Sequence, residues 1–256
     1  MSGLFDLTGQ VAVVTGAAAG GLGAYAAAAL AGHGAALMLA DLPEQHAGLE
    51  QTAADCPTDT AIQPCDVTDE SQVEALLAAT VARHGRCDVL VNAAGVMLRR
   101  PYDTTTPAEF ERVVRVNLTG TWLVARAAGQ RMAAAGRGRI VNFTSVYAER
   151  VGPIPESAYY AAKAGVVNVT RALAAELGGH GVTVNCLAPG VFFPTKMTAP
   201  LADDPQRLRW FEQRTMLGRL GSPATDLAGP LLLLASAASG YITGQVLYVD
   251  GGWSAW

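Results

Sequence analysis

The chain has few of the side chains that build metal centres or disulfide frameworks. Its 256 residues include only four cysteines and four histidines, and no Cys-x-x-Cys motif or Cys/His cluster occurs among them. Proteins that bind zinc or depend on disulfides usually carry such clusters. We therefore expect no metal site and a cytoplasmic protein whose cysteines are reduced thiols, namely Cys56, Cys65, Cys87 and Cys186.

Basic charge and long apolar runs are also scarce. The formal net charge is −4, which provides no basic surface for a polyanion and argues against nucleic-acid binding. Met1 to Phe5 lacks a basic region followed by an apolar run, so no signal peptide is expected. The most apolar stretch, Leu231 to Ala238, is too short to span a bilayer. We expect neither nucleic acid nor a membrane as a partner.

Apolar residues and glycine are abundant: half of the residues are hydrophobic and 28 are glycine. Short β-branched runs alternate with longer helical patterns, and most of these runs are almost continuously apolar. This pattern is typical of parallel strands that are covered on both faces. The expected strands are Val11 to Thr15, Ala35 to Ala40, Ala61 to Asp66, Val89 to Asn92, Arg139 to Thr144, Val182 to Leu187 and Gln245 to Val249.

The sustained strand–helix alternation predicts an α/β fold with a doubly wound sheet of seven parallel strands and helices on both faces. An apolar stripe predicts a helix over Glu70 to His84. Thr106-Pro107 and Ser222-Pro223 each resemble a helix start. No linker or repeat interrupts the chain, so we expect a single domain over residues 1–256, with ligands at the carboxyl ends of the strands.

A glycine-rich turn, Thr15 to Gly23, joins the first strand to an alanine-rich helix. Such a turn lets the backbone approach a pyrophosphate at the positive end of the helix, although it can also be a tight turn without a ligand. Asp41 ends the second strand, where a carboxylate can bind an adenosine ribose or cap the next helix. No Lys or Arg lies in Ala17 to Leu22 or in Leu42 to His46, so we predict NAD(H) in preference to NADP(H).

Tyr159 and Lys163 stand four residues apart in an alanine-rich run that is predicted to be helical. Positions i and i+4 share one helix face, so the phenol and the ammonium can point into one cleft. At about 4 Å and an effective dielectric of about 20, the ammonium favours the phenolate by on the order of 4 kcal/mol, which lowers the phenol pKa by about 3. The alternative is a solvated Tyr/Lys pair; Tyr160 has no lysine four residues later.

Together these motifs make the whole chain resemble the short-chain dehydrogenase/reductase family, whose members have a single-domain Rossmann-type fold. The glycine turn, Asp41 and the Tyr-x-x-x-Lys pair match family motifs in order. Further matches are Asp66-Val67, Asn92-Ala93-Ala94-Gly95, Asn117, Ser145, Pro189-Gly190 and the segment from Ile242 to Gly252.

The resemblance implies a hydride transfer between NAD(H) and a secondary alcohol or ketone. In the family, the tyrosine handles the hydroxyl proton, the serine binds the substrate oxygen, the lysine lowers the tyrosine pKa and binds the nicotinamide ribose, and the asparagine holds a water. The implied catalytic residues are Asn117, Ser145, Tyr159 and Lys163. The implied cofactor contacts are Gly16, Gly20, Gly21, Leu22, Gly23, Asp41, Asp66, Val67, Asn92, Gly95, Tyr159, Lys163, Pro189, Gly190 and Thr195.

Three loops are one residue longer than the family pattern. Either Gly20 or Gly21 can take the central glycine place, Ser145 lies 14 residues before Tyr159, and Thr195 comes one residue late. Ser145 could instead cap a strand end, and Asn117 could be a helix asparagine bonded to backbone. A loop absorbs one residue at small cost, so the assignment stands while individual contacts shift.

The segment Phe192 to Leu217 resembles the family's substrate lid and is rich in apolar side chains. These favour a hydrophobic ketone or alcohol, or simply pack the lid onto the core. A 3-oxoacyl thioester reductase, with Arg99, Arg100 and Arg150 near the site, and a sugar or polyol dehydrogenase remain alternatives. A catalytically silent NAD-binding sensor or scaffold is disfavoured because the catalytic residues are all present. The resemblance also implies a homodimer or homotetramer, joined through the apolar helices from Phe110 to Ala135 and Ala158 to Leu177 and through the last strand.

Overall fold

A computed structural model describes residues 3–256. Met1 and Ser2, the start of the segment without a signal-peptide pattern, lie outside the described residues. The strands are β1 (Val11–Thr15), β2 (Ala36–Ala40), β3 (Thr60–Ile62), β4 (Val89–Asn92), β5 (Gly138–Phe143), β6 (Val182–Pro189) and β7 (Val246–Val249). The helices are α1 (Leu22–Gly32), α2 (His46–Ala54), α3 (Glu70–His84), α4 (Pro107–Val114), α5 (Thr121–Ala134), α6 (Ser157–Leu177), α7 (Pro205–Glu212) and α8 (Ala228–Ala235).

The seven strands form one parallel sheet in the order β3-β2-β1-β4-β5-β6-β7. The predicted doubly wound fold is confirmed. The chain builds outward from β1 to β3, then crosses back to place β4 on the other side of β1. Thr15 and Asn92 are paired at the ends of β1 and β4. This is the point where the strand order reverses, and open α/β sheets bind ligands there.

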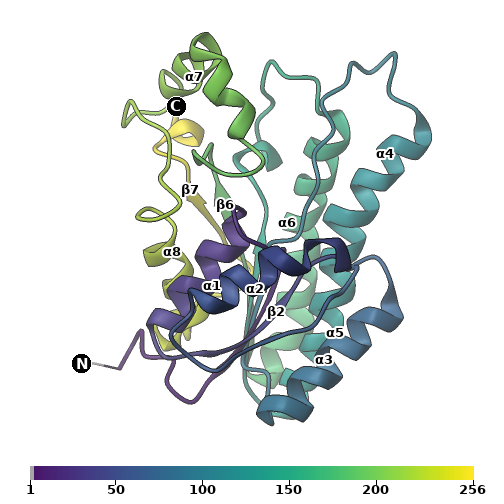
Figure 1. Ribbon diagram of the computed structural model, residues 1–256, viewed down its shortest axis with the longest axis vertical. Coiled ribbons are helices and arrows are strands. Elements are labelled where there is room, and N and C mark those ends of the chain that lie inside the picture. The colour runs from purple at the N-terminus through teal and green to yellow at the C-terminus, as the bar shows by residue number, and fades with distance from the viewer. Residues whose placement is uncertain (1–2) are drawn as a thin grey trace.

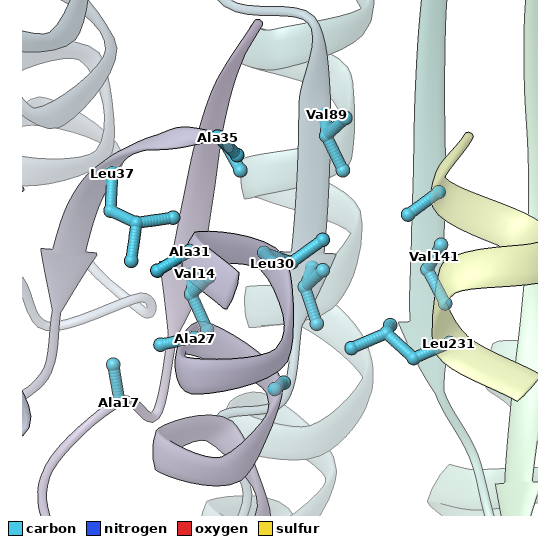
Figure 2. Close-up of a cluster of buried hydrophobic side chains, with 14 of the residues drawn as sticks. Val14, Ala17, Ala27, Leu30, Ala31, Ala35, Leu37, Val89, Val141 and Leu231 are labelled. Atoms are coloured by element: carbon cyan, nitrogen blue, oxygen red, sulfur yellow. The ribbon is translucent and has the colours of Figure 1, made fainter. Parts of the chain in front are cut away.

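Helices cover both faces of the sheet (Figure 1). On one face α1, α2 and α8 bury their apolar side chains, and on the other face α3, α5 and α6 do so. Figure 2 shows the first of these layers, in which Leu30 of α1 and Leu231 of α8 pack beside Val14 and Val141 of the strands. Because most strand residues are buried, their sequences are continuously apolar, as expected for parallel strands.

Two helix starts differ in how well the sequence predicted them. Thr106 caps α4, and its hydroxyl and the Glu109 carboxylate form the expected reciprocal capping box. The helix predicted at Ser222-Pro223 was placed too early, because α8 begins at Ala228. Residues 223–226 form a turn instead, closed by the Ser222 N–H on the Asp226 carboxylate at 2.8 Å. Pro230 lacks an N–H and fits only the first turn of the helix that follows.

The third strand is shorter than predicted, since β3 ends at Ile62 rather than at Asp66. Pro64 cannot donate a ladder hydrogen bond, so the regular strand stops before it. The residues on either side of the proline still bond to β2, with Gln63 N–H on Leu39 O at 3.0 Å and Cys65 N–H on Asp41 O at 2.8 Å. Asp66 therefore lies in a loop beside the end of β2. Within residues 3–256, no helix is both long and apolar enough to cross a bilayer.

Candidate active site

One cavity of about 1110 Å³ runs along the carboxyl ends of the strands. Its glycine end contains Gly16, Gly21, Asp41 and Asp66, and its tyrosine end contains Met97, Arg99, Ser145 and Tyr159. Asp41 follows β2 and Ser145 follows β5, so three strand spacings, about 14 Å, separate them. The sequence-predicted residues that line the cavity are Gly16, Gly21, Leu22, Asp41, Asp66, Val67, Gly95, Asn117, Ser145, Tyr159, Lys163, Pro189, Gly190 and Thr195.

The glycine turn is shaped by close backbone contacts. Gly16 has φ 66°, and a Cβ there would lie 2.6 Å from Ala94 N. Gly21 is the N-cap of α1 and lines the cavity, with no side chain capping the helix. The first N–H groups of α1 are therefore available to an anion. This backbone cradle fits the pyrophosphate of a dinucleotide.

Three predicted cofactor residues do not line the cavity. Gly20 has φ 85° and makes the turn, so Gly21 takes the place next to the cavity. Gly23 packs on the turn itself, since a Cβ there would lie 2.1 Å from Gly16 O. Asn92 is 3% exposed, and its amide donates to Thr121 O and to Asn142 Oδ1 at 3.2 and 2.9 Å. These three residues support the backbone around the cavity and do not themselves line it.

Asp41 is held rigidly at the glycine end. Its Oδ2 accepts the Ala18 N–H at 3.0 Å and its Oδ1 accepts the Leu42 N–H at 2.9 Å. The carboxylate thus ties the end of β2 to the glycine turn and still faces the cavity. Two bonded oxygens keep one negative charge fixed where the ribose of a dinucleotide would lie.

Tyr159, Ser145 and Lys163 meet at the tyrosine end of the cavity, on α6 and after β5. The Ser145 hydroxyl accepts the Tyr147 N–H at 3.2 Å, which leaves its own proton free to donate. Despite the longer loop between them, Ser145 and Tyr159 line the same cavity. The Lys163 ammonium donates to Phe143 O at 2.8 Å and lies 5.6 Å from the centre of the Tyr159 ring.

The expected direction of the tyrosine pKa shift is wrong for this structure. Burial raises the pKa of Tyr159 to about 12, and the interaction with Ser145 offsets this only in part. Burial likewise lowers the pKa of Lys163 to about 8. The ammonium faces the ring and a carbonyl rather than the phenol oxygen, so desolvation outweighs charge attraction. The Tyr-x-x-x-Lys motif predicts that the two side chains are neighbours, but it does not predict how deeply they are buried, and burial decides the direction of both pKa shifts.

Asn117 lies in a π-helical segment, Arg115–Gly120, that interrupts the helix predicted from Phe110 to Ala135. Its side-chain amide donates to Val113 O at 2.9 Å, the carbonyl that its own N–H would use in a regular α-helix, and to Val96 O at 2.8 Å. Its Oδ1 is buried with no protein partner among the described residues. A Cβ built on Gly95 lies 2.6 Å from this oxygen and 3.7 Å from Lys163 Nζ, so both atoms face the same glycine.

The apolar side chains of the segment 192–217 mainly pack onto the protein. Phe211 is 3% exposed and packs with Trp210 and Trp253, whose rings lie 5.2 and 5.8 Å from its own. Phe192 and Met197 line the cavity, whereas Phe193, Trp210, Phe211 and Met216 do not. The packing alternative therefore accounts for most of the aromatic residues, and the case for a hydrophobic substrate weakens.

Sequence reasoning missed several polar residues that the fold brings to the site, among them Gln45, Glu111, Arg112 and Arg115 in the cavity wall. Lys196 and Thr198 line the cavity, and Glu156 stands behind Arg99. Lys196 donates to Gln45 Oε1 at 2.7 Å, although 151 positions separate the two residues. Among the three arginines noted in the sequence, only Arg99 lines the cavity, because Arg100 pairs with Glu109 and Arg150 donates to Ser254 O. No local signal could have found these long-range pairs.

Comparison with known proteins shows the family of this chain. A family model described as enoyl-(acyl carrier protein) reductase matches residues 16–254. The chain is 40% identical over 249 residues to the short-chain reductase protein NovJ of Streptomyces niveus, covering 95% of this chain and 93% of that protein. This chain belongs to the short-chain dehydrogenase/reductase family.

Two further relatives of this short-chain dehydrogenase/reductase extend the comparison. D-threitol dehydrogenase of Mycolicibacterium smegmatis is 39% identical over 253 residues, covering 98% of this chain and 95% of that protein. A solved gluconate 5-dehydrogenase of Burkholderia cenocepacia J2315, in complex with NADP and tartrate, has a TM-score of 0.91 at 36% identity, with 98% of each chain covered. The protein is an NAD(P)-dependent oxidoreductase that acts on CH–OH groups.

The residues present fit such a cofactor. The cavity offers the glycine cradle at one end and the orphaned Asn117 Oδ1 beside the Lys163 ammonium at the other. When bound, a nicotinamide dinucleotide supplies the hydride donor or acceptor of the reaction. Within residues 3–256, no group of three or more His, Cys, Asp or Glu side chains could hold a metal ion.

Proposed function

We propose that this enzyme interconverts a polyhydroxylated secondary alcohol and its ketone, with NAD(H) as the cofactor. The observation that carries this proposal is that Ser145, Tyr159 and Lys163 share one cavity with the glycine cradle and Asp41. The polyol class is supported by the aromatic lid residues being used in packing, by Arg99 in the cavity wall, and by relatives named as D-threitol and gluconate 5-dehydrogenases.

The catalytic roles follow from the side chains. Tyr159 takes the hydroxyl proton in alcohol oxidation and returns it in ketone reduction. Ser145, whose oxygen is already fixed by the Tyr147 N–H, donates its proton to the substrate oxygen and holds it beside the phenol. Lys163 uses one of its three donors on Phe143 O, which leaves two for a cofactor ribose and for a water bound by Asn117 Oδ1.

A screen of alcohols tests the proposed activity. We would incubate the protein with NAD⁺ and, separately, gluconate, glucitol, threitol, galactitol and the apolar alcohol cyclohexanol, and follow NADH by absorbance. We expect turnover with at least one polyhydroxylated compound and weak or no turnover with cyclohexanol. A preference for cyclohexanol would instead support the hydrophobic-alcohol alternative, which Val96, Met97, Phe192 and Met197 in the cavity wall favour.

The preference for NAD(H) over NADP(H) rests on Asp41. Its fixed carboxylate would repel a 2′-phosphate while it accepts hydrogen bonds from a ribose diol. Lys196 is a cation at the glycine end that the sequence did not reveal, because it reaches Gln45 across 151 positions of the chain. We expect kcat/KM for NAD to exceed that for NADP about 10- to 100-fold, a difference of about 1.4 to 2.7 kcal/mol.

Two variants test this cofactor choice. Asp41→Ala removes the carboxylate, so it should narrow the ratio of kcat/KM for NAD and NADP mainly by improving NADP. Lys196→Met should widen the ratio, because it removes a cation that contacts Gln45 and the glycine turn. Equal kcat/KM for the two cofactors in the wild-type enzyme would contradict the proposal.

We also propose that the enzyme is a homodimer or homotetramer. β7 is the edge strand of the sheet, with β6 as its only neighbour, and its four residues are each half-buried. Trp122 and Phe110, on the helices beside the cavity, are 38% and 37% exposed. Exposed apolar edges and helix faces of this kind suit contacts between copies. Light scattering after size exclusion measures the mass directly, and a monomer would contradict this proposal.

A cytoplasmic location is proposed on the basis of the cysteines. Cys56, Cys65, Cys87 and Cys186 are all buried and unpaired. Free thiols suit a reducing compartment. Cell fractionation with detection of the protein checks this directly.

A further inference from the structure

Arg99 and Glu156 form an ion pair in the wall of the tyrosine end. Arg99 Nε donates to Glu156 Oε1 at 2.9 Å. The Glu156 side chain is 1% exposed, whereas the Arg99 side chain is 35% exposed and lines the cavity. Both charges act on the catalytic phenol, since Glu156 raises the pKa of Tyr159 and Arg99 lowers it. The pair therefore lies close to the reacting position.

The pair is poorly explained as a stabilising contact. Burial raises the pKa of the Glu156 carboxyl, and only the attraction to Arg99 and Arg207 works against this. Its Oε2 is buried and has no hydrogen-bond partner among the described residues. A buried carboxylate with one unbonded oxygen lowers the free energy of unfolding. Replacing such an ion pair by hydrophobic residues of similar size often leaves the stability unchanged or raises it. Such incomplete pairs in a cavity wall point to a role in binding or catalysis.

The Arg99 guanidinium has donors to spare. Of its five N–H donors, only Nε–H bonds to the protein within residues 3–256. The guanidinium is planar, and Glu156 binds it at Nε, so the N–H groups of Nη1 and Nη2 stay free to donate. Val96, Met97 and Met197 also line the cavity, as do the charged side chains of Glu111, Arg112 and Arg115. A planar pair of cationic donors in the cavity wall matches a carboxylate, which it can bind through two parallel hydrogen bonds.

We propose that Arg99 is the specificity-determining residue that binds the carboxylate of a hydroxy-acid substrate, and that Glu156 is its positioning residue. This inference rests on the proposed function, because it adds a carboxylate to the proposed polyhydroxylated substrate, at a carbon other than the one that reacts. Arg99 binds the carboxylate through its free N–H groups, while Ser145 and Tyr159 bind the reacting oxygen. The substrate is thereby held at two points, which fixes the carbon presented for hydride transfer.

Gluconate and glucitol form a matched pair of probes, since they differ in a carboxylate against a hydroxymethyl group. With NAD⁺, the wild-type enzyme should prefer gluconate. Arg99→Met should lower kcat/KM for gluconate about 10- to 100-fold, mostly through KM, and change that for glucitol less than about threefold. Arg99→Lys should recover part of the loss because it keeps the charge but not the planar guanidinium. Equal losses on both probes would overturn the inference.

Arg100→Met is the control, because Arg100 is the adjacent arginine, pairs with Glu109 at 2.7 Å and does not line the cavity. It removes the same charge and should leave the preference for gluconate unchanged. Glu156→Gln keeps the size of the side chain but loosens the hold on Arg99. It should raise KM for gluconate more than KM for glucitol, whereas a purely structural role would lower the melting temperature and affect both probes alike.

Calorimetry separates this inference from the proposed activity. Gluconate and glucitol are titrated into the NADH-bound enzyme, where no turnover occurs. We expect gluconate to bind more tightly than glucitol and Arg99→Met to abolish that difference, even if neither compound is oxidised and the proposed reaction is wrong. If the wild-type enzyme binds neither probe, or binds glucitol as well as gluconate, Arg99 is not a carboxylate site.

Discussion

The glycine end and the tyrosine end of the cavity are held together by different kinds of contact. At the glycine end, backbone groups and Asp41 bond the turn after β1 to the end of β2, as in the Ala17 N–H on Ala40 O and the Ala18 N–H on Asp41 Oδ2. At the tyrosine end, side chains from separate loops meet, as in Arg99 with Glu156. The glycine end is therefore shaped mainly by the backbone. The tyrosine end is shaped by side chains, each of which can be substituted without changing the others.

This difference predicts different outcomes of mutation. Substitutions at the glycine end should affect folding or cofactor binding, because the backbone there has little room to move. Substitutions at the tyrosine end should affect turnover and substrate choice while the fold and the cofactor affinity survive. In the proposed reaction one end binds the cofactor and the other transfers the proton, so the two roles can be tested by measuring stability, NADH affinity and rate on the same variants.

The largest expected effect is that of Tyr159→Phe. Removing the phenol oxygen removes the proton acceptor and donor, so kcat should fall about 10²- to 10⁴-fold. NADH affinity, measured by fluorescence titration, should change little, because the glycine cradle and Asp41 are untouched. Activity near the wild-type level would remove Tyr159 from its proposed role, and lost NADH binding would show that the two ends are not separable.

How much of the site the sequence could predict depends on how far apart the contacting residues lie along the chain, and not on the end of the cavity. The glycine turn, Asp41 and the Tyr159–Lys163 pair can each be read from a short stretch of sequence, and residues of all three line the one cavity. The pair Arg99–Glu156, separated by 57 positions, and the pair Lys196–Gln45 exist only after folding. No periodicity or motif encodes them.

Burial was the second thing that spacing could not predict. The i, i+4 pattern placed Lys163 beside Tyr159 but not its contact with Phe143 O, and it predicted the wrong direction for the Tyr159 pKa. The predicted end of the third strand was wrong for a different reason. A single proline, Pro64, ends the regular strand although the residues around it are largely apolar. Desolvation and local backbone chemistry are properties of the folded chain rather than of a residue pattern.

Lys163 lies where the two ends meet, and its burial should appear in the pH dependence of stability. Its pKa falls from 10.5 to about 8 on folding, so between these values the unfolded chain binds a proton that the folded chain has released. The free energy of unfolding contributed by this residue therefore rises with pH in that window. Relative to Lys163→Met, the wild-type protein should gain on the order of 3 kcal/mol between about pH 7 and pH 10.

Denaturant unfolding of both proteins across this pH range measures the difference, in which the other titrating groups cancel. Lys196→Met, which removes the same charge from an exposed side chain, is the control for net charge. A difference between wild type and Lys163→Met that stays constant with pH would show that water reaches the ammonium in the folded protein.

The smallest expected effect compares two glycines of the same turn. A Cβ at Gly23 would lie 2.1 Å from Gly16 O, whereas a Cβ at Gly21 would lie 3.5 Å from its nearest neighbours, Ala18 O and Gly16 O. Gly23→Ala should therefore lower the free energy of unfolding by about 1–3 kcal/mol, and Gly21→Ala by less than about 1 kcal/mol. Because only Gly21 faces the cavity, Gly21→Ala should instead weaken NADH binding.

Thermal unfolding and NADH titration of the two variants give both readouts. For a chain of this size, 1 kcal/mol corresponds to about 2–4 °C in Tm. If Gly21→Ala destabilises the fold as much as Gly23→Ala does and leaves NADH affinity intact, then the turn is only a packing element and the glycine end is not where the dinucleotide binds. If instead Gly23→Ala mainly lowers Tm and Gly21→Ala mainly weakens NADH binding, then Gly23 is required for the packing of the turn and Gly21 for its contact with the dinucleotide.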